Sequence, residues 1–196
     1  MIAAIVLAAG LSRRMGRPKL LLDVRGKALV RHAVERVLGA GMSPVSVVVG
    51  PAHAGIARAL EGLPVQLVLN PAPEKGQGSS VSAGIRALPG EAAAALIVLG
   101  DQPGVPADVI PALLDALKIP GKAIAAPRYA DGLGNPVLFA AAVFPELLEL
   151  TGDRGARSII ERDSGRVAIV EIAQPMPADI DTPEDYDRLS GPGDPR

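Results

Sequence analysis

Short apolar runs alternate along the chain with longer segments in which apolar residues recur every three or four positions. The runs contain many β-branched residues, are bounded by Gly, Pro or Asn, and are apolar at successive positions. This pattern is typical of strands that are buried on both faces of a parallel sheet. The predicted strands cover residues 2–7, 45–49, 65–69, 94–99, 123–126, 136–139 and 167–172.

The segments between these runs have the periodicity of amphipathic helices. They cover residues 28–38, 52–60, 80–88, 107–117 and 154–162. Alternating strands and helices predict a three-layer α/β fold, a doubly wound and mostly parallel sheet with helices on both faces. Ligands of such sheets bind beyond the carboxyl ends of the strands. We expect one domain over residues 1–190, followed by a disordered tail at 191–196 that is rich in Gly and Pro.

The composition restricts the functions that such a domain can have. Aromatic residues make up 2% of the chain and the net charge is −1, so we expect no nucleic-acid partner. The absence of cysteine excludes disulfides and thiolate chemistry. No apolar run reaches the length of a membrane helix, and the N-terminus lacks the basic start of a secretory signal. We therefore expect a cytoplasmic protein that does not bind membranes.

A basic loop follows the first predicted strand. Residues 13–19 include the cations Arg13, Arg14, Arg17 and Lys19. The chain has 20 Lys and Arg among 196 residues, so an average stretch of this length would contain fewer than one. Gly10 and Gly16 bracket a turn whose backbone amides could bind an anion. Cations and amides at the end of a strand predict a site for several phosphates, and a solvated charged loop is the alternative.

This loop differs from the two common nucleotide-binding motifs. A Walker A loop has four residues between its glycines and then Lys, whereas five residues separate Gly10 from Gly16 and Arg17-Pro18 follows. The dinucleotide fingerprint needs three closely spaced glycines and an acidic residue after the second strand, where Gly50-Pro51 stands. Both motifs are therefore excluded.

Two aspartates are candidates for holding a metal ion on the phosphates. Asp101 follows the predicted strand at 94–99, and Asp181 lies 80 residues later. Magnesium on a phosphate needs one or two carboxylates, so this pair would suffice if the fold brings it together. Structural alternatives remain, because Asp101 could cap the next helix and either Asp181 or Thr182 could cap a helix that Pro183 begins.

These motifs resemble those of a known family. Leu7-Ala8-Ala9-Gly10, Ser12, Arg14-Met15-Gly16 and Lys19 are similar to the signature loop of the MobA-like nucleotidyltransferases. Gly100-Asp101-Gln102-Pro103 and the late Asp181 are similar to the metal motifs of that family. The resemblance implies a Rossmann-like fold of the nucleotide-diphospho-sugar transferase type, with Mg²⁺ held by Asp101 and Asp181.

The resemblance also implies roles for residues of the loop. Arg14 and Lys19 are expected to bind the nucleotide phosphates and to act in catalysis together with Asp101. The base and ribose are expected to lie against Ala8, Ala9 and Gly10, and Leu7 and Ser12 complete the expected nucleotide-binding part of the loop.

Further segments are similar to the molybdenum cofactor cytidylyltransferases, the MocA branch of the family. They are Gly76-Gln77-Gly78-Ser79-Ser80-Val81, Gly134-Asn135-Pro136-Val137-Leu138-Phe139, Gly152-Asp153-Arg154-Gly155-Ala156-Arg157 and residues 179–186. The branch implies transfer of CMP from CTP to the phosphate of the molybdopterin cofactor, release of pyrophosphate, and a molybdenum hydroxylase as recipient. Gly78 and Ser80 are then expected at the base, and Asn135, Arg154 and Arg157 at the acceptor.

Several alternatives stay open within this interpretation. Ala9 favours CTP, because the guanylyltransferase branch tends to carry Gly there, but the difference is one methyl group. Asn135 stands where the branch commonly has His, so the acceptor could differ. Ser79 and Ser80 could cap a helix, and Arg154 and Arg157 could form surface ion pairs. The competing functions are a guanylyltransferase, a transferase for a sugar phosphate or a methylerythritol phosphate, and a non-catalytic carrier of the pterin cofactor.

Overall fold

The fold is built on one large sheet that contains every predicted strand. The computed structural model describes residues 1–12, 15–153 and 155–190. The strands are β1 (Ile2–Ala8), β4 (Val45–Val49), β5 (Gln66–Leu69), β6 (Ala94–Leu99), β7 (Ile124–Tyr129), β8 (Gly132–Leu133), β9 (Val137–Ala140) and β10 (Val167–Glu171). Their order is β10-β7-β9-β6-β1-β4-β5, with β8 beside β7. All pairs are parallel except those made by β8 and β9, so the prediction of a mostly parallel sheet is confirmed.

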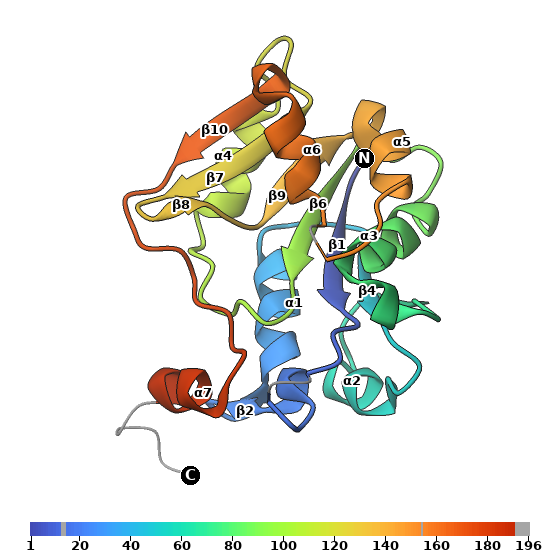
Figure 1. Ribbon diagram of the computed structural model, residues 1–196, viewed down its shortest axis with the longest axis vertical. Coiled ribbons are helices and arrows are strands. Elements are labelled where there is room, and N and C mark those ends of the chain that lie inside the picture. The colour runs from blue at the N-terminus through green and yellow to red at the C-terminus, as the bar shows by residue number, and fades with distance from the viewer. Residues whose placement is uncertain (13–14, 154, 191–196) are drawn as a thin grey trace.

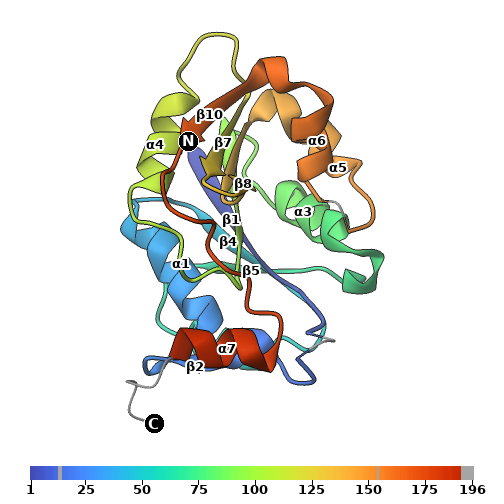
Figure 2. The ribbon, with the colours of Figure 1, turned by 60° about the vertical axis from the view of Figure 1, so that its left-hand side comes forward.

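Helices cover both faces of this sheet, as Figure 2 shows. One face carries α1 (Leu29–Gly39) and α4 (Val109–Ala116), and the other carries α3 (Gln77–Arg86), α5 (Phe144–Leu148) and α6 (Arg157–Arg162). At one end lie α2 (Ala54–Ala59), α7 (Pro183–Ser190) and the hairpin of β2 (Asp23–Val24) and β3 (Lys27–Ala28). Short 3-10 helices are η1 (Lys19–Leu21), η2 (Pro73–Lys75), η3 (Ala141–Val143) and η4 (Ser164–Arg166). Within the described part of the chain, no helix has the length and apolar character needed to cross a membrane.

The central strand β1 contributes side chains to two cores. Val6 and Ala8 belong to the apolar cluster on the side of α1 and α4, whereas Ile5 belongs to the cluster on the side of α3 and α5. Successive side chains of a strand point to opposite faces, so a strand covered on both sides must be apolar throughout. On the α3 side, a Cβ atom added to Gly84 would lie 2.5 Å from Cγ2 of Ile5. The missing side chain therefore lets α3 lie directly on β1.

The carboxyl ends of β1 and β6 define the place where a ligand is expected. The chain passes from β1 to β4 and β5 on one side and then crosses to β6 on the other side of β1. Such a reversal of strand order is where α/β sheets bind ligands. Both ends point toward the part of the molecule that contains α7 (Figure 1). The C-terminal segment returns to this place, because the Ile180 amide donates a hydrogen bond to the Asp101 carbonyl at 3.3 Å.

Candidate active site

A cavity of about 560 Å³ opens at the carboxyl ends of β1 and β6. Its walls come from the loop after β1, from η2 and the first turn of α3, and from the segment before α7. The volume is in the range of small-molecule sites. Six of the residues predicted to bind the nucleotide line the cavity: Leu7, Ala9, Gly10, Ser12, Lys19 and Ser80.

Two other predicted nucleotide contacts, Ala8 and Gly78, do not line the cavity. Ala8 alternates with Leu7 and Ala9 along the chain, and its side chain lies in the core on the other face of the sheet. Gly78 faces a different segment, because a Cβ atom added there would lie 2.9 Å from the carbonyl carbon of Leu150. Because glycine has no Cβ atom, the segment at Leu150 can pass close to the start of α3. The predicted residues Arg14 and Arg154, and the tail at 191–196, lie outside the described residues.

Lys19 joins the two predicted metal ligands at the base of the cavity. Its Nζ atom lies 2.6 Å from Oδ2 of Asp101 and 2.6 Å from Oδ1 of Asp181, which are 82 and 162 residues away along the chain. Burial by itself lowers the pKa of Lys19, but the charge of Asp101 and hydrogen bonds to both aspartates outweigh this and raise the pKa. The side chain is therefore a charged ammonium at neutral pH.

Neither aspartate is a helix cap, so the capping interpretation is wrong for Asp101 and Asp181, whereas its other form, a cap by Thr182, is confirmed. Helix α4 begins only after Asp108, which is its N-cap residue and forms no capping hydrogen bond through its side chain. Thr182 caps α7, because the Asp185 amide donates to Oγ1 of Thr182 at 3.3 Å while Oδ2 of Asp185 accepts from the Thr182 amide at 2.8 Å. This reciprocal pair is a capping box. The carboxylates of Asp101 and Asp181 meet Lys19 instead.

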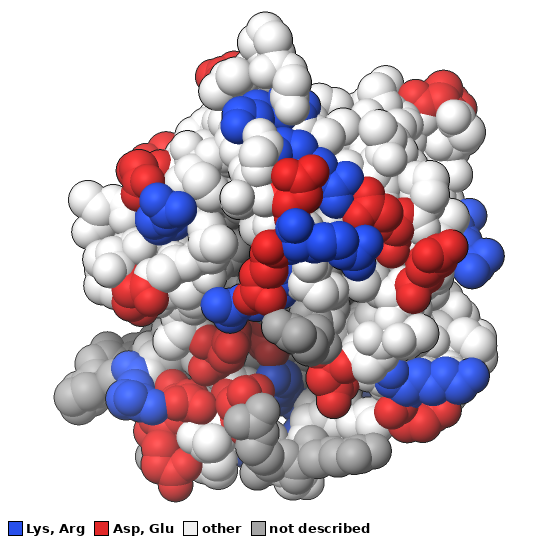
Figure 3. Space-filling view, turned by 45° about the horizontal axis from the view of Figure 1, so that its top comes forward, with Lys and Arg blue, Asp and Glu red and all other residues white. Residues whose placement is uncertain are grey.

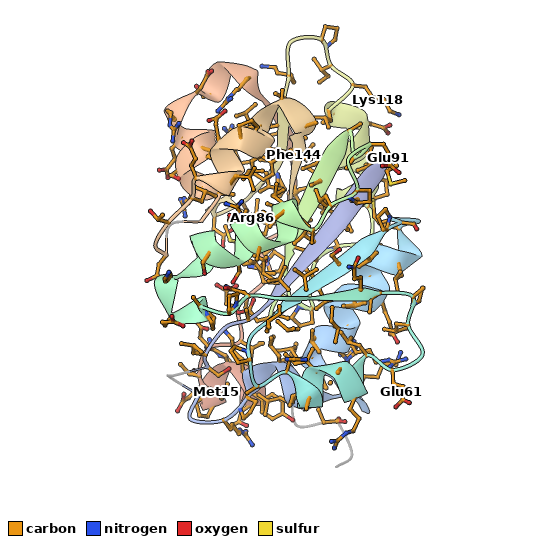
Figure 4. All side chains as sticks on the ribbon, turned by 90° about the vertical axis from the view of Figure 1, so that its right-hand side faces the viewer. Met15, Glu61, Arg86, Glu91, Lys118 and Phe144 are labelled. Carbon is orange, nitrogen blue, oxygen red and sulfur yellow. The ribbon has the colours of Figure 1, made fainter. Side chains whose placement is uncertain are left out.

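The described part of the basic loop is held in place by its own contacts. Oγ of Ser12 accepts a hydrogen bond from the Lys19 amide at 3.1 Å. Met15 is 6% exposed and belongs to the apolar cluster beneath α1, and Figure 4 shows it at the end of the molecule where this loop turns. The guanidinium carbon of Arg17 lies 5.5 Å from the ring centre of Tyr186 in α7. These contacts order the loop, and Lys19 lines the cavity with its side chain 11% exposed. A loop whose charges are only solvated would leave this side chain in water.

Asn70 connects the end of β5 to the first turn of α3. It is 2% exposed, and its Nδ2 atom donates to Oγ of Ser79 at 2.9 Å and to Oγ of Ser80 at 3.0 Å. Its Oδ1 atom accepts from the Ala72 amide at 3.0 Å. The helix begins earlier than predicted, and its N-cap Gly76 makes no side-chain cap, so the serines do not cap it. Sequence reasoning missed Asn70, which carries no motif of its own.

Replacing Asn70 with alanine is expected to destabilise the protein and to raise the KM for the nucleotide that the sequence motifs predict as ligand. The change leaves a buried amide and hydroxyl with fewer partners, which costs about 1–3 kcal/mol. Denaturation by urea measures the first effect, and steady-state kinetics measure the second. Gln66→Ala, at an exposed position on β5, is the control. Wild-type stability and KM in Asn70→Ala would remove the assigned role.

Carboxylates outnumber cations among the described residues of the cavity wall. Among the lining residues within the described part of the chain, the charged side chains are Lys19 and the acids Glu74, Asp101, Asp153, Asp179 and Asp181. Figure 3 shows acidic side chains gathered around a hollow in the lower half of the face that it presents. The charges of these described residues favour a polyphosphate that enters together with a cation.

Asp179 experiences the negative charge of this wall most directly. Partial burial and the charge of Asp101 raise its pKa, although Nε2 of Gln102 donates a hydrogen bond to Oδ1 of Asp179 at 2.7 Å. Gln102 is 3% exposed, and its bond to Asp179 attaches the C-terminal segment to the end of β6. Sequence reasoning singled out neither residue for a role, since a single polar residue beside a stronger motif gives no separate signal.

Asp101 and Asp181 fit a divalent cation. Their oxygens already converge on one cation, the ammonium of Lys19. In the described ranges, no three or more His, Cys, Asp or Glu side chains form a complete metal cluster. Two carboxylates suffice for Mg²⁺ or Mn²⁺ when phosphate oxygens and water supply the other ligands. The set suits a metal ion that is bound together with a nucleotide.

A second cavity of about 310 Å³ adjoins the first. The two share the lining residues Leu7, Gln77, Leu99, Asp153 and Asp179. Two predicted acceptor residues, Asn135 and Arg157, line the second cavity. The Asn135 carbonyl accepts a hydrogen bond from the hydroxyl of Tyr129 at 2.8 Å. This bond holds the loop between β8 and β9 against β7. Arg157 also forms the predicted surface ion pair, with Glu161 at 3.1 Å.

Curated proteins that resemble this chain carry several different names. Purine catabolism protein PucB of Bacillus subtilis is 32% identical over 195 residues, which cover 94% of each chain. Nicotine blue oxidoreductase of Paenarthrobacter nicotinovorans is 34% identical over 205 residues, 96% of each chain. A probable molybdenum cofactor guanylyltransferase of Pyrococcus horikoshii is 30% identical over 152 residues, 77% of this chain and 73% of that protein.

Solved structures share the whole fold. The Rv0371c homologue from Mycobacterium sp. strain JC1 superposes with a TM-score of 0.87 at 30% identity, over 96% of this chain and 94% of the other. Rv0371c of Mycobacterium tuberculosis in complex with manganese gives a TM-score of 0.80 at 30% identity, over 96% of each chain. The Rossmann-like fold of the nucleotide-diphospho-sugar transferase type is therefore confirmed.

The family model for the MobA-like NTP transferase domain matches residues 4–167. This range runs from β1 to the start of β10 and includes Lys19 and Asp101. Because the match covers most of the chain and agrees with the fold, the protein belongs to the MobA-like NTP transferase family and is a nucleotidyltransferase.

Proposed function

We propose that the protein transfers CMP from CTP to the terminal phosphate of a molybdenum-bearing pterin cofactor and releases pyrophosphate. The observation that carries this proposal is the convergence of Lys19, Asp101 and Asp181 on one point in the cavity beyond β1 and β6. The name of the Pyrococcus relative supports an acceptor related to the molybdenum cofactor. We assign the reaction to the cytoplasm, with a molybdenum hydroxylase as the recipient of the product.

In this proposal the triphosphate lies against the loop after β1. The ammonium of Lys19 and the guanidinium of Arg14 donate hydrogen bonds to phosphate oxygens, and Ser80 and Ala9 face the base and ribose. Asp101 and Asp181 hold Mg²⁺, which when bound neutralises phosphate charge as a Lewis acid. The manganese complex of Rv0371c supports the use of a divalent metal. The base contact made by Ala9 favours CTP over the larger GTP.

The acceptor occupies the second cavity, beside Asn135 and Arg157. Because the two cavities share part of their walls, its phosphate can reach the nucleotide from that side. An oxygen of the acceptor phosphate forms a bond to the α-phosphorus, and the bond from that phosphorus to the bridging oxygen of pyrophosphate breaks. The attacking oxygen is already an anion, so no general base is needed. Catalysis then consists of positioning and charge neutralisation.

A panel of nucleotides and acceptors tests this function through pyrophosphate release. ATP, CTP, GTP and UTP are each combined with the molybdenum pterin, a sugar phosphate and a methylerythritol phosphate. We expect turnover with CTP and the pterin. Preference for GTP or for another acceptor contradicts the proposed substrates, and tight pterin binding without turnover supports a carrier. We do not propose the oxidoreductase activity that the name of the Paenarthrobacter relative carries, because the loop after β1 lacks the dinucleotide fingerprint.

A further inference from the structure

We infer that Lys19 is an internal cation that closes the metal site, so that a divalent metal ion binds together with the nucleotide rather than before it. This inference rests on the proposed function, because it assigns Asp101 and Asp181 to a metal ion and Lys19 to the phosphates. The inference adds that the metal ion does not bind before the nucleotide. Neither the fold nor the roles of these residues requires this order of binding.

The first observation is that the ammonium already occupies the point on which both carboxylates converge. Nζ of Lys19 lies 2.6 Å from an oxygen of each aspartate. The Lys19 side chain is 11% exposed, whereas those of Asp101 and Asp181 are 20% and 28% exposed. A free dication approaching the pair meets this positive charge at short range and must displace it. The attraction of the two carboxylates for a metal ion is therefore partly cancelled.

The second observation is that Lys19 is fixed at its backbone while its side chain is long. The amide of Lys19 donates to Ser12, and the next residue, Leu20, is 5% exposed in the core beneath α1. The ammonium can thus leave the aspartates only by rotation of its flexible four-carbon stem. The cavity around it is lined by Gly10, Leu11 and Ser12 of the loop, where we have placed the phosphates.

The charges explain why a nucleotide permits this movement and a free metal ion does not. Displacement by a free ion would leave a buried ammonium close to a dication and without its two close contacts to Asp101 and Asp181, which is costly at low dielectric. A triphosphate supplies new anionic partners for the ammonium and further oxygen ligands for the metal. Metal and nucleotide should therefore each raise the affinity for the other, and by the same factor.

Binding of Mn²⁺ in the absence of nucleotide tests the inference, with the free ion measured by electron paramagnetic resonance. Wild-type protein should bind Mn²⁺ weakly, and Lys19→Met should bind it at least about tenfold more tightly, within the usual range of coupling between sites. Lys19→Arg keeps the cation and should stay weak. Lys27→Met is the control, because Lys27 is about half exposed and pairs with Glu35 instead of lining the cavity. Equal affinities in wild type and Lys19→Met would overturn the inference.

A measurement on the wild-type protein keeps the test independent of how Lys19→Met folds. The ¹⁵N signal of the Lys19 ammonium, assigned from its loss in Lys19→Arg, reports whether the two aspartate contacts persist. We expect the signal to stay unchanged with millimolar Mg²⁺ and to shift when a non-hydrolysable CTP analogue is added with it. A full shift with Mg²⁺ alone would contradict the inference.

The two proposals can fail separately. If the wild-type protein transfers CMP to the pterin but Lys19→Met binds Mn²⁺ no more tightly, the order of binding is wrong and the function stands. If Lys19→Met gains affinity for Mn²⁺ but no nucleotide is transferred to the pterin by the wild type, the inference stands and the proposed substrates are wrong.

Discussion

Replacing Asp101 with alanine is expected to lower the rate of pyrophosphate release by about 10²–10³-fold or more, the usual loss when one group that stabilises transition-state charge is removed. The protein should remain folded, because Lys19 keeps its bond to Asp181 and the segment at 180 still docks through its backbone on residue 101. A coupled pyrophosphate assay measures the rate, and circular dichroism checks the fold.

Asp115→Ala is the matched control for this change. Asp115 is an exposed aspartate on α4 that pairs with Lys118 at 2.7 Å, away from the cavity. Its removal should leave the rate at the wild-type value. Wild-type activity in Asp101→Ala would remove the metal assignment from this residue.

Replacing Gly100 with alanine is expected to lower kcat by about 10–10²-fold, because a misplacement of about 1 Å can cost 10²-fold. A Cβ atom at this position would lie 2.8 Å from the carbonyl oxygen of Leu7, which is backbone and cannot rotate away. The ends of β1 and β6 must then separate, and Asp101 moves with its strand. Such overpacking also destabilises the fold by about 1–3 kcal/mol.

Gly90→Ala separates this effect from a general cost of replacing glycine. Gly90 is exposed, and a Cβ atom added to it would meet nothing within 4 Å. Its stability and rate should match the wild type in the same urea titration and pyrophosphate assay. If Gly100→Ala also behaves like the wild type, the spacing of the two strand ends does not control the position of Asp101.

The fold was predictable from the sequence because its strands are buried on both faces. Each apolar run stands between Gly, Pro or Asn residues, so its position could be read without knowing its neighbours. The antiparallel direction of β9 could not be predicted from the sequence. An antiparallel strand that is covered on both faces has the same apolar pattern as a parallel one. Helix α5 was missed because Phe144–Leu148 is too short to display a helical period.

The site was predictable only in part. The loop and the acids were found because motifs mark Lys19, Asp101 and Asp181 separately. That Lys19 bridges the two aspartates depends on contacts across 82 and 162 residues, which no local pattern contains. Strand alternation already indicates that the side chain of Ala8 lies on the face opposite to those of Leu7 and Ala9, and its contact with the nucleotide stays a prediction. Asn70 acts through buried hydrogen bonds that leave no trace in the sequence.

The position of a metal ion relative to the nucleotide tests the central claim most directly. Crystals grown with Mn²⁺ and a non-hydrolysable CTP analogue would show the metal by its anomalous scattering. The account predicts one peak that contacts Asp101, Asp181 and a phosphate oxygen, with Lys19 turned to the phosphates. A peak bound only by phosphate oxygens, with Lys19 still on both aspartates, would contradict it.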